Sequence, residues 1–141
     1  MEKGIEELYN SIYDVLVSNA SYIGLGDERH YPDPSLFEML IWNIVIAFFV
    51  NLFADDLHYR LFSKKEGVKK EEMEKIAQEV VIQIGKKQET KLAERTLIRA
   101  EVEVKKLLIR KGWSRNVAEK DSKKIAENVH KWLRSRKVMI E

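Results

Sequence analysis

Apolar side chains recur at every third or fourth position over four stretches of the chain, a period that is typical of amphipathic α-helices. In the first stretch, Ile5, Leu8 and Ile12 share a face whose opposite side is acidic. No stretch shows the strict alternation of a half-buried β-strand. The pattern therefore predicts an all-α fold with four principal helices, at about residues 4–20, 35–63, 69–111 and 116–136.

The second predicted helix carries a dense apolar segment. Sixteen of the nineteen residues from 36 to 54 are apolar, and as a helix the segment would span roughly 28 Å. A helix that is apolar on nearly every face is surrounded either by protein or by lipid. Its small and polar side chains follow one narrow line, at Asn43, Ala47, Asn51, Asp55 and His58.

Three environments suit this segment. The polar line can be the solvent edge of a central helix, or an interface or pore lining where copies of the chain meet. Alternatively, residues 36–54 can form a single membrane span, which would leave the basic C-terminal part in the cytoplasm.

The other predicted helices offer only narrow apolar stripes. We therefore expect part of the second helix to stay uncovered within one chain, and a homodimer or higher oligomer to bury it. The predicted interface comprises Ile41, Asn43, Ile44, Ala47, Phe48, Asn51, Asp55 and His58.

Capping residues mark the start of the second helix. Asp33 can cap it with Pro34 in the first helical position. Alternatively, Ser35 is the cap and Glu38 reaches back to the helix start, which is the capping-box arrangement.

The third predicted helix contains a glycine. Residues 85–91 contain no apolar side chain, so the chain either bends there or continues as one long helix with a weak point, which we favour. Gly112 is expected to end this helix, and Asn116 with Glu119 to form a capping box for the last one.

Composition agrees with a single helical domain over residues 1–141, and the absence of cysteine excludes disulfides and thiolate chemistry. The charge is unevenly distributed. Residues 1–62 carry ten acidic and three basic side chains, whereas residues 105–141 carry four acidic and twelve basic ones. Such a basic C-terminal region can attract the acidic front of the same chain, another copy, or a polyanion.

Within residues 105–141, the last helix is the candidate for binding nucleic acid or acidic lipid, because phosphates require several cations on one surface. An aromatic residue could add base stacking. The alternative is an ordinary solvated helix surface with the tryptophan in the core. The candidate residues are Lys120, Lys123, Lys124, Lys131, Arg134 and Trp132.

No pattern identifies a catalytic, cofactor or metal site. His30 and Asp33, or Asp55 and His58, lack the spacing of metal-binding motifs, and the second pair is better suited to a salt bridge. The GLGD at residues 24–27 lacks the preceding strand that a dinucleotide site needs. We therefore expect neither enzymatic activity nor a cofactor.

These observations favour a non-enzymatic, cytoplasmic interaction or assembly protein that self-associates through its second helix. The first alternative is a small membrane protein, with residues 36–54 inserted and copies associating as a channel. The second alternative is a nucleic-acid-binding protein that uses its basic C-terminal helix.

Overall fold

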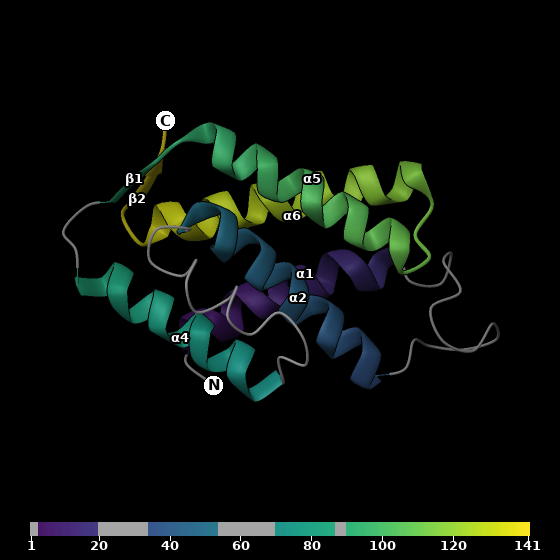
Figure 1. Cartoon of the computed structure of the whole chain (residues 1–141), viewed down its shortest axis with the longest axis horizontal. Helices are drawn as coiled ribbons and strands as arrows, with labels where there is room; N and C mark the ends of the chain where they lie inside the picture. Colours follow the sequence, from purple (N-terminus) through teal and green to yellow (C-terminus); the bar gives the residue numbers. More distant parts are fainter. Residues whose placement is uncertain (1–2, 20–33, 54–69, 87–89) are drawn as a thin grey trace.

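Helix α2 runs through the middle of the protein, with the other helices around it (Figure 1). The structure is a computed structural model that describes residues 3–19, 34–53, 70–86 and 90–141. The all-α class is confirmed for these residues, which also contain two short strands. The elements are α1 (Lys3–Asn19), α2 (Pro34–Leu52), α4 (Lys70–Lys86), β1 (Thr90–Leu92), α5 (Glu94–Arg110), α6 (Arg115–Ser135) and β2 (Val138–Ile140).

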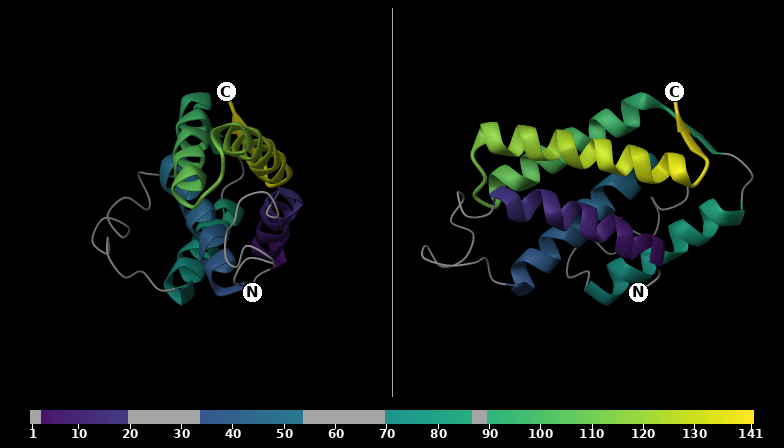
Figure 2. Two further views of the ribbon diagram at one scale, coloured as in Figure 1. Left: turned by 90° about the vertical axis from the view of Figure 1, so that its right-hand side faces the viewer. Right: turned by 180° about the vertical axis from the view of Figure 1, so that it is seen from behind.

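The helices form layers around α2. Helices α1, α4 and α5 each pack against it, and α6 lies alongside both α1 and α5. The end-on view places α2 at the centre, with α5 and α6 above it and α4 below (Figure 2, left). A helix in this position needs apolar side chains on most of its faces, and the sequence of α2 supplies them.

The side chains of α2 are enclosed within a single chain. Ile41, Ile44, Phe48 and Phe49 are all 0% exposed. The expectation that the companion helices would leave this surface uncovered was therefore wrong. Apolar stripes on α1, α4 and α5 converge on α2 from different directions, so that together they cover what no single stripe could.

The prediction of one long helix over residues 69–111 was also wrong, because the strand β1 (Thr90–Leu92) lies between the end of α4 at Lys86 and the start of α5 at Glu94. Strand β1, which precedes α5, pairs in parallel with β2, which follows α6. Thr90 lies opposite Val138 and Leu92 opposite Ile140. Non-local hydrogen bonds thus take the place of helical ones at Thr90–Leu92.

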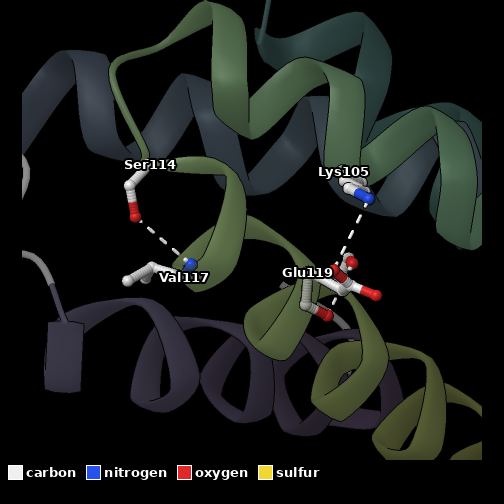
Figure 3. Close-up of polar contacts among 5 residues, drawn as sticks. Lys105, Ser114, Val117 and Glu119 are labelled. Carbon is white, nitrogen blue, oxygen red and sulfur yellow. Dashed lines mark hydrogen bonds and ion pairs between the residues drawn. The ribbon is translucent and has the colours of Figure 1, made fainter.

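Gly112 ends α5 as predicted. It adopts a positive φ of 107°, and Trp113 N donates to Leu108 O at 3.0 Å while Gly112 N donates to Ile109 O at 3.1 Å. These two bonds form the Schellman motif. The next helix begins one residue earlier than predicted, because Ser114 and not Asn116 is its cap, accepting a hydrogen bond from Val117 N (Figure 3).

Helix α2 begins at Pro34, as the first of the two capping alternatives predicted. Glu38 does not reach back to the helix start but forms an ion pair with Lys70 of α4, with 2.5 Å between the charged atoms. Helix α2 ends at Leu52, short of the predicted residue 63, and residues 54–69 lie outside the described part of the chain.

We predict that Phe48→Ala lowers the free energy of unfolding by about 3–5 kcal/mol, because it opens a cavity in the core. The exposed Ile82→Ala should change it by no more than about 0.5 kcal/mol. Urea unfolding at low and high protein concentration measures both. A wild-type midpoint that rises with protein concentration would contradict the burial of α2 within one chain.

Candidate functional site

The predicted interface on α2 is divided between core and partly covered positions. Ile41, Ile44 and Phe48 are fully buried, whereas Asn43 and Ala47 are half-buried. Asp55 and His58 lie outside the described residues, as do His30, Asp33 and the GLGD segment. Contact between copies through the buried members would require the fold to open, so the physical reason for association through α2 is removed.

Asn51 has a role within the chain. Its Nδ2 donates to Ala47 O at 2.7 Å and to Glu103 Oε2 of α5 at 2.8 Å. The polar line on α2 therefore contributes to joining α2 and α5. Across the described ranges, no helix is both long enough and apolar enough to cross a membrane.

The predicted basic residues of α6 are all exposed, on the side of the helix opposite buried Ile125 and Val129. Lys120, Lys124 and Lys131 line a groove of about 670 Å³ between α1 and α6, whose opposite wall carries Glu7 and Asp14. Buried Asp121 of α6 also lines this groove, so the groove contains three carboxylates and three ammonium groups. Carboxylates that line the same groove reduce the attraction of the lysines for a polyanion.

The remaining predicted cations, Lys123 and Arg134, are exposed on α6 and do not line the groove. All five predicted cations therefore lie on the exposed side of α6, and three of them border the groove that also carries carboxylates.

Trp132 is a core residue and not an exposed stacking platform. Its indole Nε1 donates to Gly4 O of α1 at 2.9 Å. Its ring stacks on Phe49 of α2 at a centroid distance of 5.9 Å, and the Arg136 guanidinium lies 4.6 Å from its centroid. Trp113 is buried too, and donates to Asp121 Oδ2 at 2.9 Å. Neither indole has a free face for a nucleic-acid base.

Sequence reasoning missed the outer surface of α5. Ile98, Val102 and Ile109 are 52%, 44% and 38% exposed, and we call these three residues the α5 stripe. Their spacing of four and seven places them on one side of the helix. A second apolar row of the same helix, with Ala100, Val104 and Leu108, is buried. The spacing was visible in the sequence, but the pattern could not show which row would be covered.

A row of cations follows the α5 stripe. Arg95, Arg99 and Lys106 each precede a stripe residue by three positions, so they lie beside the stripe along the helix. All three are exposed, and none forms an ion pair with any other described residue. We call this row the basic edge.

Helix α5 is fixed on both of its other sides. Glu103 accepts the hydrogen bond from Asn51 of α2, and Lys105 pairs with Glu119 of α6 at 3.7 Å (Figure 3). The Gly112 turn and the β1–β2 pair hold the two ends of the α5–α6 hairpin. The α5 stripe is therefore presented on a fixed helix, so that binding a partner does not require ordering it.

Titratable groups of the described part form no cluster suited to a metal ion. The most perturbed group is Tyr9 of α1, whose ring lies 5.4 Å from that of Trp42. Burial, followed by the nearby charge of Glu38, raises the pKa of Tyr9 to about 12. Because a phenol of such high pKa stays protonated at neutral pH, Tyr9 acts as a packing residue and not as a base.

No protein-family model matches the chain, and no curated protein or solved structure is significantly similar to it.

We predict that the contribution of Tyr9 to stability is fully present below pH 10 and is lost as the pH rises to about 12. The folded protein keeps the Tyr9 proton until its pKa of about 12, whereas an unfolded tyrosine releases its proton near its ordinary pKa of 10. An ultraviolet titration of the phenols should show a component near pH 12 that Tyr9→Phe lacks. If the substitution instead removes a component near pH 10, the shielding of Tyr9 is refuted.

Proposed function

We propose that this protein is a non-enzymatic, cytoplasmic interaction module that binds its partner through the α5 stripe. The main support is the exposure of Ile98, Val102 and Ile109, whereas the large apolar side chains of α2, such as Ile44 and Phe48, are buried. Exposed apolar side chains that share one helix face are typical of contact sites. The proposal keeps an assembly role for the chain and assigns it to α5 in place of α2.

The energetics favour contact at this helix. Full burial of an isoleucine or valine side chain contributes roughly 1.5–3 kcal/mol, and the stripe residues are already about half-buried. Three such side chains can therefore supply several kcal/mol to an interface. Docking costs little reorganisation, because α5 is held by α2 and α6.

Self-association is the second candidate. The spacing of the α5 stripe resembles the seam of a coiled coil, in which two equivalent helices interdigitate. Two-fold pairing is the commonest way for a chain to bury such a seam. A homodimer would then form through α5.

We predict that a photo-crosslinking amino acid at Val102, expressed in the native host, gives a covalent adduct of defined mass. The same group at Val17, an exposed apolar residue of α1, is the matched control and should give far less. The adduct mass distinguishes another protein from a second copy. Equal labelling at the two positions, or none at either, would refute α5 as the contact surface.

A further inference from the structure

We infer that the partner at the α5 stripe is an amphipathic helix that carries aspartate or glutamate beside its own apolar seam. The inference rests on the proposed function and specifies the chemistry of the partner. It follows from two features of α5, the spacing of its exposed apolar residues and the charge of the row beside them.

The spacing favours a helix as the bound element. From Ile98 the α5 stripe advances by four residues to Val102 and by seven to Ile109. The intermediate position belongs to Lys105, at the border of the stripe, whose ammonium pairs with Glu119 of α6. Steps of four, three and four are the repeat of a coiled-coil seam, into whose holes a partner helix inserts its own side chains.

The charge favours an acidic helix. Each residue of the α5 stripe has an exposed cation three positions before it, so a helix lying along the stripe passes close to Arg95, Arg99 and Lys106. Because these cations form no ion pair with another described residue, carboxylates of the incoming helix can pair with them without breaking one there. Pairs at the rim of an interface mainly select the partner and accelerate the encounter.

A second copy of the chain in antiparallel pairing is less favoured. Antiparallel pairing about a two-fold axis would place the basic edge of one copy next to the same edge of the other, and like charges in contact weaken association. A nucleic acid is also less favoured, because Ile98, Val102 and Ile109 offer no aromatic face and both indoles beside the basic region are buried.

The test uses the full chain and two labelled synthetic helices that share one leucine and isoleucine seam. One helix has glutamates beside the seam and the other has glutamines. Fluorescence anisotropy should show the glutamate helix binding at least about tenfold more tightly at low salt, with most of this advantage lost at high salt. The combined variant Arg95→Glu and Lys106→Glu should abolish the preference, while circular dichroism checks that it remains folded.

Val102→Asp separates the inference from the proposed function, with Val17→Asp as the control that should bind as wild type does. If Val102→Asp abolishes binding but both helices bind equally well, the stripe is a contact surface and the acidic partner is refuted. The acidic partner is refuted too if the stripe mediates only dimerisation of the chain, or only binding to anionic lipid vesicles. If Val102→Asp changes none of these, the proposed function fails as well.

Discussion

The enclosure of α2 governs the arrangement of the three helices that pack against it. Its side chains are apolar on almost every face, and leaving them in water would cost about 25 cal/mol for each Å² of exposed apolar surface. The chain meets this demand by placing α1, α4 and α5 around α2, so that Phe48 and Phe49 have no exposed surface. Each surrounding helix is positioned by the part of α2 that it covers.

Trp132 shows how the outer helix is joined to this core. This residue of α6 contacts two other helices: its indole nitrogen donates to Gly4 O of α1, and its ring stacks on Phe49 of α2. An aromatic residue in such a position contributes a large buried area while its polar atom is satisfied. A residue that the sequence suggested for ligand binding thus contributes to the packing of α6.

The proposed function follows from what the core leaves uncovered. Helix α5 has two apolar rows, and the core uses the one containing Val104 and Leu108. The other row, with Val102 at its centre, lies next to the basic edge, whose three cations form no ion pair within the described part of the chain. By contrast, the lysines that line the α1–α6 groove face carboxylates of α1, so the two basic areas of the same hairpin differ in the charge that they present.

The amino-acid sequence predicts the helical class, the approximate extent of the first and last helices, and the turn at Gly112. It does so because periodicity, capping and glycine geometry act over a few neighbouring residues. The interruption of the predicted long helix could not be predicted, because the strand that pairs with Thr90–Leu92 follows α6, more than forty residues later in the chain. Packing between distant elements was likewise needed to show that Ile44 is covered, that Val102 is not, and that Trp132 is core. Local pattern shows that a face is apolar, but whether another element covers that face depends on contacts between residues far apart in the chain.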